Sequence, residues 1–456
     1  MTRNLFVHAL GAVVAIRLTG LEDADAEAVR RVWADAVADE GRTDAVATVS
    51  PRAGDDRDAM LVDLSQRVTR AAIEAVRGKA WILHAAGLAA PNGRVIVFVG
   101  PSGSGKTCVV SAVGAALGLG YVSDDAVAID GSGAVLPYRK PLTISADEAA
   151  PRQSAPGERG IGALPDAPLQ VAAIVLLDRR DDAGDLPLVT PVDFGDALSE
   201  LVAQSSHLAD MAAPLQTMAA LAASVGTVHR LTYRNADRLG PAVAALLAET
   251  PTAVDPTACA ASAAVLRPAP PEEGVPVYTR ALTLDALSLA DPDRLALLHV
   301  DQYGQGTVRM LAGIAPAIWR AADAATLDDL VAAVVAEHGT PGERDAAASV
   351  VSVVDTLRRE GVLEERPRWA IRESAVWTDL HDRVVVLVPR GGGVVPRALE
   401  GSAAAVWLSL VDGAGSVRDI VEPLAARLEA DPAAVGAEVS ALLEYLEDAG
   451  VVARLS

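Results

Sequence analysis

Apolar and polar residues follow two different periods along the chain, and the two periods alternate in its first half. Short runs rich in valine and isoleucine predict buried strands at 94–99, 121–130, 171–180 and 227–234. Apolar residues that recur every three to four positions predict helices at 61–76, 108–120, 196–206, 210–224 and 237–249. Strands that alternate with helices in this way indicate an α/β domain, which we place at residues 79–250.

The residues before this domain, 1–78, predict a small α/β subdomain. It consists of a strand within 1–20, a helix at 22–38, a polar loop at 42–58 and a final helix. The apolar start contains His8 and Arg17 and lacks a convincing cleavage site, so we interpret it as a strand and not as a signal peptide. After the α/β domain, the proline- and alanine-rich residues 251–276 predict a linker.

The last part of the chain contains an internal duplication. Leu-x-Gly-x-Ala-x-Ala-Ile-Trp at 311–319 recurs as Leu-x-Gly-x-Ala-x-Ala-Val-Trp at 399–407, and two further blocks match in the same order. Each copy predicts a β-hairpin followed by three helices. In the first copy the strands are at 294–300 and 306–311, and the helices at 315–322, 326–338 and 345–360. In the second copy the strands are at 383–389 and 393–399, and the helices at 403–410, 416–428 and 432–449. We therefore predict two small α+β domains of winged-helix type, at 277–366 and 371–456.

The composition limits the classes of function. The 456 residues carry a formal charge of −21, which argues against a nucleic-acid binder and leaves room for peptide partners. Cys108 and Cys259 do not imply a disulfide framework, which fits a reducing cytosol. No apolar run reaches the roughly 18 residues of a membrane span, so we expect a cytoplasmic protein without a membrane partner.

The strongest chemical motif is GPSGSGKT at 100–107, between a predicted strand and a predicted helix. Glycines let backbone amides turn toward phosphate oxygens, and the next helix directs its positive end to the same anion. In such loops the lysine reaches the β- and γ-phosphates and the threonine hydroxyl binds Mg²⁺. The motif thus predicts an ATP and Mg²⁺ site that comprises Gly100, Ser102, Gly103, Ser104, Gly105, Lys106 and Thr107.

Segments around this loop make a family resemblance visible. LHAAGLA, GPSGSGKT and YVSDDAVAID together resemble the HPr kinase/phosphorylase superfamily, especially its shorter relatives beside peptide natural-product genes, including lasso-peptide precursor kinases. The resemblance covers about residues 60–250. It implies that Asp124 accepts the proton of a substrate hydroxyl and that Asp125 holds the metal with Thr107. It also implies that His84 polarises the site or orients the two carboxylates, with a satisfied core histidine as the alternative.

The chain departs from this family at two places. Glu158 lies one position away from the family's acidic residue, which leaves its part in metal binding open. The arginine-rich C-terminal segment of the bacterial HPr enzymes has no evident counterpart, so phosphorylase activity and HPr as the substrate are not expected. We interpret Lys140 as a solvated turn residue, with contact to phosphate or peptide as the alternative.

The duplicated pattern resembles PqqD-like domains, the recognition elements that bind leader peptides of ribosomally synthesised natural products. In that family the leader adds as a strand to the hairpin edge and packs against the last helix. In this chain the edge strand is 306–311 or 394–399. Because only the second copy keeps the Asp412-Gly413 turn typical of the family, we assign the leader site there, to Val394, Val395, Arg397, Leu399, Leu442 and Tyr445.

Two alternatives for the duplicated copies are less favourable. Trp319 and Trp407 are expected to be core residues of their copies and not ligand contacts. A winged-helix DNA binder is disfavoured because the helix at 432–449 has no basic residue and carries Glu438, Glu444, Glu447 and Asp448, which phosphates would repel.

These observations favour two functions of different kinds. The first is an ATP-dependent peptide kinase that captures the leader of a precursor peptide and phosphorylates a Ser or Thr hydroxyl. The second is a recognition subunit that binds the leader and delivers the precursor to modifying enzymes of a lasso- or daptide-type pathway, with a regulatory or vestigial nucleotide site. A P-loop ATPase that drives a conformational step is a third interpretation.

Overall fold

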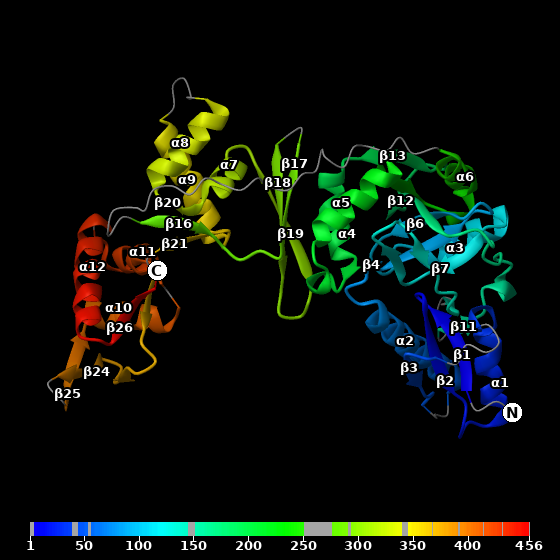
Figure 1. Cartoon of the computed structure of the whole chain (residues 1–456), viewed down its shortest axis with the longest axis horizontal. Helices are drawn as coiled ribbons and strands as arrows, with labels where there is room; N and C mark the ends of the chain where they lie inside the picture. The colour runs from blue at the N-terminus through cyan, green and yellow to red at the C-terminus, as the bar shows by residue number, and fades with distance from the viewer. Residues whose placement is uncertain are drawn as a thin grey trace. The chain divides into compact units, whose positions relative to one another are not determined.

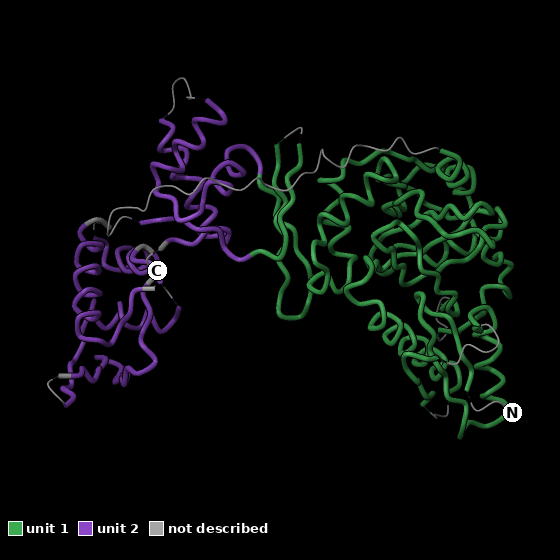
Figure 2. The backbone as a smooth tube through the Cα atoms, in the orientation of Figure 1, with its two compact units in different colours: residues 1–262, 283–311 green, residues 263–282, 312–456 purple. Residues whose placement is uncertain are grey.

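The computed structural model divides the chain into two compact units. It describes residues 4–38, 44–52, 56–144, 151–249, 276–290, 293–339, 345–366, 368–390, 393–413, 415–430 and 432–455 (Figure 1). Unit 1 comprises Met1–Ser262 and Thr283–Leu311, and unit 2 comprises Ala263–Leu282 and Ala312–Ser456 (Figure 2). The predicted linker at 251–276 lies almost entirely outside the described residues. The predicted α/β class is confirmed, with mixed sheets covered by helices.

The N-terminal subdomain of unit 1 is a three-stranded sheet covered by two helices. The expected single strand within 1–20 is a hairpin of β1 (Asn4–Ala9) and β2 (Ala12–Arg17), because Leu10 and Gly11 adopt positive φ angles of 49° and 78° and turn the chain. Strand β3 (Ala47–Val49) pairs parallel to β2, so the predicted polar loop contains a strand. The helices are α1 (Asp23–Val32) and α2 (Arg57–Val76), and the Asp56 carboxylate caps α2.

The main sheet of unit 1 has the strand order β13-β15-β12-β6-β5-β7. Its parallel centre is β15 (Val228–Tyr233), β12 (Gln170–Arg179) and β6 (Arg94–Val99), and its antiparallel strands are β13 (Leu188–Val192), β5 (Ala85–Ala89) and β7 (Gly120–Ser123). Residues of β6 alternate between two cores, since Val97 packs with α4 (Phe194–Ala203) and α5 (Pro214–Val225), whereas Phe98 packs with α3 (Lys106–Leu117) and α6 (Gly240–Ala248). This alternation explains why β6 is apolar throughout.

The predicted strand at 121–130 is wrong in one respect that matters for the site. It is two strands in different sheets: β7 belongs to the main sheet, and β8 (Val127–Asp130) belongs to a second sheet of order β14-β4-β8-β9. The other strands of that sheet are β14 (Ser205–Ser206), β4 (Ala80–Leu83) and β9 (Val135–Leu136). The chain bends between them at Asp124 and Asp125, where the Ser123 hydroxyl accepts the N–H groups of Asp125 and Ala126.

Unit 1 also contains the sheet of the first sequence copy. The predicted hairpin gains a third strand and is β17 (Asp285–Leu289), β18 (Arg294–Val300) and β19 (Gly306–Ala312). Leu287 and Leu298 share one core with α4 and α5. The Asp285 carboxylate accepts the N–H of Leu215 at 2.8 Å, at the start of α5, which ties this sheet to the α/β domain.

Unit 2 contains the helices of the first copy and the whole second copy. The first set is α7 (Ala315–Ala321), α8 (Leu327–His338) and α9 (Ala346–Arg359), with β16 (Val277–Arg280), β20 (Asp323–Ala325) and β21 (Leu363–Arg366) as a small sheet. The second copy has β22 (Arg368–Ile371), β23 (Val376–Asp379), β24 (Arg383–Arg390), β25 (Gly393–Glu400), α10 (Ser402–Val411), α11 (Val417–Leu428), α12 (Pro432–Asp448) and β26 (Val452–Leu455).

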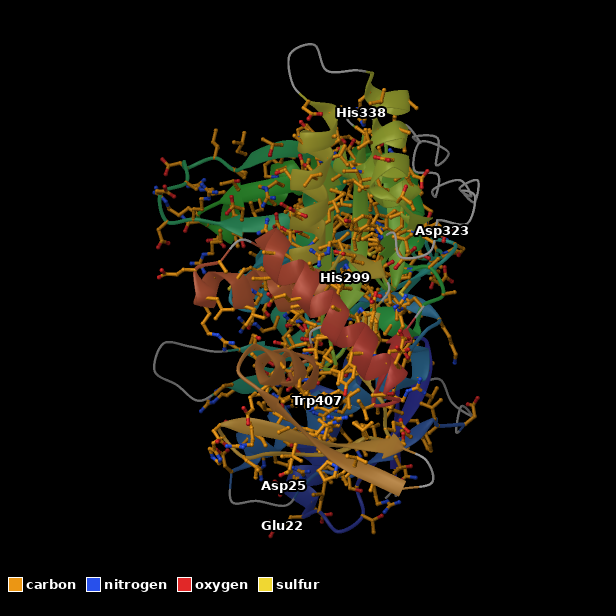
Figure 3. All side chains as sticks on the ribbon, turned by 90° about the vertical axis from the view of Figure 1, so that its left-hand side faces the viewer. Glu22, Asp25, His299, Asp323, His338 and Trp407 are labelled. Atoms are coloured by element: carbon orange, nitrogen blue, oxygen red, sulfur yellow. The ribbon has the colours of Figure 1, made fainter. Side chains whose placement is uncertain are left out.

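Apart from the short strand β20 between α7 and α8, the described elements of the two copies follow the same order, including a last strand that pairs with the first: β21 with β16 and β26 with β22. Trp319 and Trp407 are 5% and 0% exposed, as predicted for core residues. Trp407 lies between the β24–β25 hairpin and α12 (Figure 3) and packs with residues of both. Within the described parts of the chain, no helix has the length and apolarity needed to cross a bilayer.

Candidate functional site

The glycine-rich loop joins β6 to α3 at the edge of a large cavity in unit 1. Gly103 and Gly105 adopt positive φ angles of 83° and 90°, which other residues rarely adopt, and a Cβ atom on Gly105 would lie 2.7 Å from the Tyr233 hydroxyl. The Lys106 ammonium donates to the backbone oxygens of Gly100 at 2.6 Å and Pro101 at 3.0 Å. Burial lowers the pKa of Lys106 to about 8, although Asp125 and Asp124 oppose the shift.

The cavity has a volume of about 730 Å³ and brings together most of the residues predicted for the site, whereas Gly100 and Ser104 of the loop are not in its lining. Its lining includes His84, Gly103, Lys106, Thr107, Asp124 and Asp125. Arg159 and Arg179 also line it, so four side chains of positive charge, with Lys106 and Lys140, face the same space. Such a cavity suits a ligand with several negative charges.

Asp124 is enclosed by donors. It is only 5% exposed, and its carboxylate accepts the Thr107 hydroxyl at 2.9 Å and the Tyr121 hydroxyl at 2.8 Å. Burial, followed by the charge of Asp124, raises the pKa of Tyr121 well above its usual value, so this hydroxyl remains a donor. Thr107 therefore hydrogen-bonds to Asp124, while the prediction that it holds a metal with Asp125 stays a prediction.

Lys140 lies between the two carboxylates. Its Nζ atom is 3.4 Å from Asp124 and 3.6 Å from Asp125, and the residue is 5% exposed. Burial alone would lower the pKa of Lys140, but the two carboxylates outweigh it and raise the pKa. The interpretation of Lys140 as a solvated turn residue is wrong, because this buried cation balances the adjacent carboxylates.

Asp125 and His84 form the more open side of the site. Each side chain is 38% exposed, and His84 Nδ1 lies 3.4 Å from an Asp125 carboxylate oxygen. The contact with His84, helped by Lys140, lowers the pKa of Asp125 to about 2. The backbone N–H of His84 donates to the Gln204 carbonyl at 2.7 Å, which fixes the main chain just after β4. The exposure of His84 excludes the alternative of a satisfied core histidine.

Candidate metal ligands are few in the cavity. Among the residues described, no three His, Cys, Asp or Glu side chains are grouped so that they could hold a metal ion. Glu158 is exposed, accepts the Ser154 hydroxyl at 3.1 Å and does not belong to the lining. A cation here would depend on Thr107, the Asp pair and ligand oxygens, which is how Mg²⁺ is held beside phosphates.

The second candidate site lies in unit 2, on the second sequence copy. Strand β25 is an edge of the sheet β23-β24-β25. Val394 and Val395 are 61% and 38% exposed and Arg397 is exposed, whereas Leu399 is 7% exposed and packs in the core. On α12, Tyr445 is 48% exposed. Thus the structure leaves five of the six predicted peptide contacts at least partly accessible and buries Leu399.

Leu442 lines a separate cavity of about 240 Å³, enclosed by α10, α11 and α12. Its walls are mainly aliphatic, and Glu438 is the one acidic residue in them. Ser402 and Ala403, which follow β25 in the chain, complete its lining. An apolar recess therefore lies on the elements that continue from the exposed edge.

The corresponding strand of the first copy is arranged differently. Val308 and Met310 of β19 pack against the core of the α/β domain. A Cβ atom on Gly306 would lie 2.8 Å from a Leu208 side-chain atom and 2.9 Å from one of Val202. Strand β19 is therefore an edge of its sheet, as β25 is, but one of its faces is covered in unit 1.

Comparison with known families bears on both copies. The family model described as Coenzyme PQQ synthesis protein D (PqqD) matches residues 292–363 and 383–452. Both segments are PqqD-like. The match confirms the resemblance predicted for the duplicated pattern, in both copies and in the same order. A search of curated proteins found no match to the chain.

The sequence did not place Lys140 or Tyr121 beside Asp124, where the structure has both. Lys140 is one of only three lysines in the chain, and this rarity could have singled it out as a functional residue. Its position 15 residues after Asp125, however, gave no reason to expect it beside the two carboxylates. Tyr121 stands three residues before Asp124 and had no polar signal, since it reads as one apolar residue of a buried strand. The PqqD-like segments, by contrast, were found from spacing alone.

Proposed function

We propose that this protein binds the leader of a ribosomally synthesised precursor peptide through its second PqqD-like segment and transfers a phosphoryl group from ATP to a Ser or Thr hydroxyl of that peptide. The observation that carries the first half is the open edge strand β25 within a PqqD-like segment. The second half rests on the glycine-rich loop and the paired carboxylates that share one cavity.

Leader binding follows from the free edge. An added strand hydrogen-bonds to the unpaired backbone of β25, and its side chains meet the exposed Val394 and Val395. The apolar recess beside α12 takes an aliphatic side chain of the peptide. In the first copy β19 is also an edge strand, but its Val308 and Met310 side chains pack against the α/β core and are not free to meet an added strand.

The cavity of unit 1 fits the triphosphate of ATP. The left-handed glycines free the loop for close approach of an anion, and α3 points its positive end at the same place. Lys106, Arg159 and Arg179 add positive charge. Thr107 and Asp124 would hold Mg²⁺, which supplies charge neutralisation on the phosphate oxygens during transfer.

The geometry favours a division of roles opposite to that implied by the family resemblance. Asp124 already accepts two hydroxyls and faces Thr107, which suits a metal ligand. Asp125 is more exposed and contacts His84, so this pair orients the acceptor hydroxyl and takes up its proton. Weak basicity at Asp125 is sufficient because phosphoryl transfer depends mainly on positioning.

A recognition subunit without transferase activity is the second candidate. It is favoured by the presence of two PqqD-like segments and by Lys106, which bonds to carbonyls of its own loop. In this case the protein delivers leader-bound precursor to separate modifying enzymes. A P-loop ATPase is the third candidate, distinguished by ATP hydrolysis without a phosphorylated peptide.

The deciding experiment is mass spectrometry of candidate precursor peptides that contain Ser or Thr, after incubation with the protein, ATP and Mg²⁺. A kinase adds one phosphoryl group to Ser or Thr, and Asp125→Asn abolishes the addition. Unmodified peptide that still binds the protein would favour the recognition subunit.

Leader binding has its own test. Neighbouring residues of a strand direct their N–H groups to opposite sides, so either Val394→Pro or Val395→Pro removes a donor from the free edge of β25. We expect one of the two to weaken leader binding at least tenfold by fluorescence anisotropy. The matched control is Val376→Pro on β23, the opposite edge of the same sheet, where the valine is 60% exposed. Equal weakening by the control would contradict strand addition at β25.

A further inference from the structure

Four polar residues in the lining of the unit 1 cavity have no part in the phosphoryl transfer proposed above, and we call them its polar end. They are Ser65 and Gln66 of α2, Thr143 of β10 (Leu142–Ile144) and Gln153 of β11 (Arg152–Ser154). Helix α2 packs against β11, which brings the two elements together. The two strands pair with each other in a separate two-stranded sheet.

Two atoms at this end are buried without a partner. Ser65 and Gln153 are 2% and 8% exposed, and neither the Ser65 Oγ nor the Gln153 Oε1 atom has a hydrogen-bond partner in the described parts of the chain. The Gln153 amide is oriented, since its Nε2 atom donates to the Thr143 hydroxyl at 2.9 Å. Buried polar atoms are nearly always paired, so an unpaired couple in one cavity indicates a ligand that supplies the partners.

The chemistry of these atoms selects the ligand. Gln153 Oε1 can only accept, so its partner must carry an N–H or O–H group. A phosphate, which is ionised and only accepts, cannot satisfy it. The Ser65 hydroxyl both donates and accepts, as a backbone N–H or C=O requires. An extended peptide presents both groups in alternation, and it is the class of molecule that satisfies the two atoms together.

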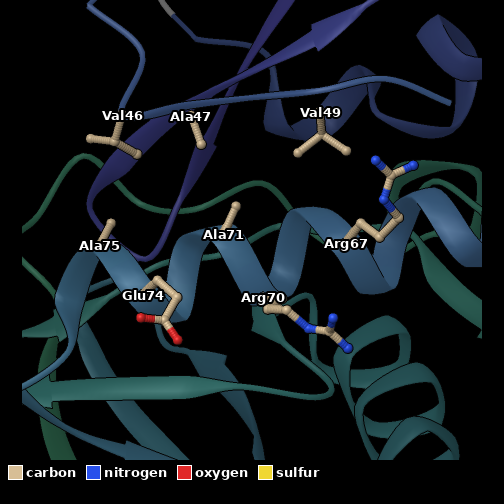
Figure 4. A pocket seen from close by; sticks show the side chains of 8 residues that line it. All are labelled: Val46, Ala47, Val49, Arg67, Arg70, Ala71, Glu74 and Ala75. Atoms are coloured by element: carbon tan, nitrogen blue, oxygen red, sulfur yellow. The ribbon is translucent and has the colours of Figure 1, made fainter.

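A separate groove of about 510 Å³ lies on the other side of α2, beside β3, and its lining includes Arg67, Arg70 and Glu74 (Figure 4). Arg67 there donates to the Ser50 carbonyl at 2.6 Å and lies 3.5 Å from Asp63. Ser65 and Gln66 do not line this groove, so they contribute to the cavity of the glycine-rich loop and not to the groove beside β3.

We propose that Ser65 and Gln153 form the acceptor subsite, in which backbone groups of the hydroxyl-bearing peptide segment are held beside Asp125. This inference rests on the proposed phosphoryl transfer and adds to it the residues that bind the backbone of the acceptor peptide. The leader would be held by unit 2 and the modified segment by α2 and β11 of unit 1.

The test uses the full chain with short synthetic peptides on an array, each with a central Ser or Thr, and a fluorescent ATP analogue. The variants are Ser65→Ala and Gln153→Met, and the matched control is Gln302→Met at an exposed turn. We expect both variants to lower kcat/KM for the peptides about tenfold, mainly through KM, with the affinity for the ATP analogue unchanged. Gln302→Met should match the wild type.

Ser65→Ala separates this role from a structural one. Removing an unpartnered hydroxyl from a helix should leave the melting temperature equal or higher, so lost peptide affinity in a fully stable variant supports the subsite. Peptide kinetics within twofold of wild type in both variants would overturn it. So would a loss of nucleotide affinity, because these residues would then hold the nucleotide base.

Failure of the kinase proposal gives a different result. If the wild type phosphorylates no peptide, binding of the labelled protein to the same array tests whether the peptide subsite exists without phosphoryl transfer. Binding that falls in Ser65→Ala and Gln153→Met, but not in Gln302→Met, retains the peptide subsite without transfer. The absence of any binding overturns the subsite.

Discussion

Substitution of Lys140 by methionine tests the charge balance of the unit 1 cavity. Methionine keeps the length of the side chain but removes the cation that lies 3.4 Å from Asp124 and 3.6 Å from Asp125. Removing one partner of a buried ion pair destabilises a protein by about 3–5 kcal/mol, because the other charge remains buried without compensation. The Lys140 and Asp124 side chains are 6% and 3% exposed, so this case applies to them.

Two features place the expected loss of unfolding free energy near the lower end of this range. Asp124 keeps the hydroxyl donors Thr107 and Tyr121, which stabilise its charge. The Asp125 side chain is 38% exposed, so solvent screens its attraction to Lys140 and little is lost there. We expect Lys140→Met to lower the stability of unit 1 by about 3 kcal/mol, which corresponds to roughly 6–12 °C in melting temperature for a domain of this size.

The loss of stability in Lys140→Met should depend on pH, in a direction set by the pKa shifts of Asp125 and Lys140. The pKa of Asp125 in the folded protein, about 2, lies below its ordinary value of 3.8, so its contribution to stability is present above about pH 4 and is lost as the pH falls toward 2. The pKa of Lys140 is raised, so its contribution persists up to about pH 10. The difference in stability between Lys140→Met and wild type should therefore be full at pH 7 and shrink below about pH 4, where protonation of Asp125 in the wild type removes its attraction to Lys140.

Urea denaturation of the full chain, followed by circular dichroism and by calorimetry, measures this loss. Lys79→Met, at an exposed lysine, is the matched control and should change stability by less than about 0.5 kcal/mol. Asp124→Asn combined with Lys140→Met should recover part of the loss, since the uncompensated charge is gone. A loss below about 1 kcal/mol, or a double variant no better than Lys140→Met, would refute the charge-balance argument.

Three further outcomes are expected. Asp285→Ala removes the cap of α5 and should lower the stability of unit 1 by about 1 kcal/mol in urea denaturation; an unchanged midpoint would argue against the tie between the first sheet and α5. Trp407→Ala should cost about 3–5 kcal/mol and lower only the calorimetric transition of unit 2, because this fully buried ring packs within the second copy. The affinity for a fluorescent ATP analogue should fall as the pH rises through about 8, where Lys106 loses its charge, and Lys106→Arg should remove this dependence; the same decline in both proteins would exclude Lys106 as the cause.

Local pattern predicted much of the second copy. Helices expected at 403–410 and 416–428 are α10 and α11, with ends that differ by one residue at most. Their boundaries are set by neighbouring residues: Ser416 and Asp419 form a capping box at the start of α11. The glycine-rich loop is local in the same sense, because its conformation depends on glycines within a few positions.

The charged centre of the cavity could not be predicted in the same way. Asp124 and Asp125 stand in an apolar run that reads as one strand, and the break between β7 and β8 comes from two sheets that meet there. Lys140 is buried only because both carboxylates lie within 3.6 Å of it across that break. Such a position depends on long-range packing, and solvation of a lone lysine is the correct expectation without it.

The two PqqD-like segments show that the same local pattern can be used in two ways. Both sequences predict a hairpin and three helices, but Leu287 and Leu298 of the first sheet pack with α4 and α5, whereas Val384 and Val386 of the second pack with α10, α11 and α12. Helix α4 leads into Gln204, whose carbonyl accepts the N–H of His84. The first sheet therefore packs against the helix that leads to the residue bonded to His84, whereas the second sheet packs within its own copy. If the proposed function holds, this difference assigns the first copy a structural part and leaves β25 of the second copy for the leader.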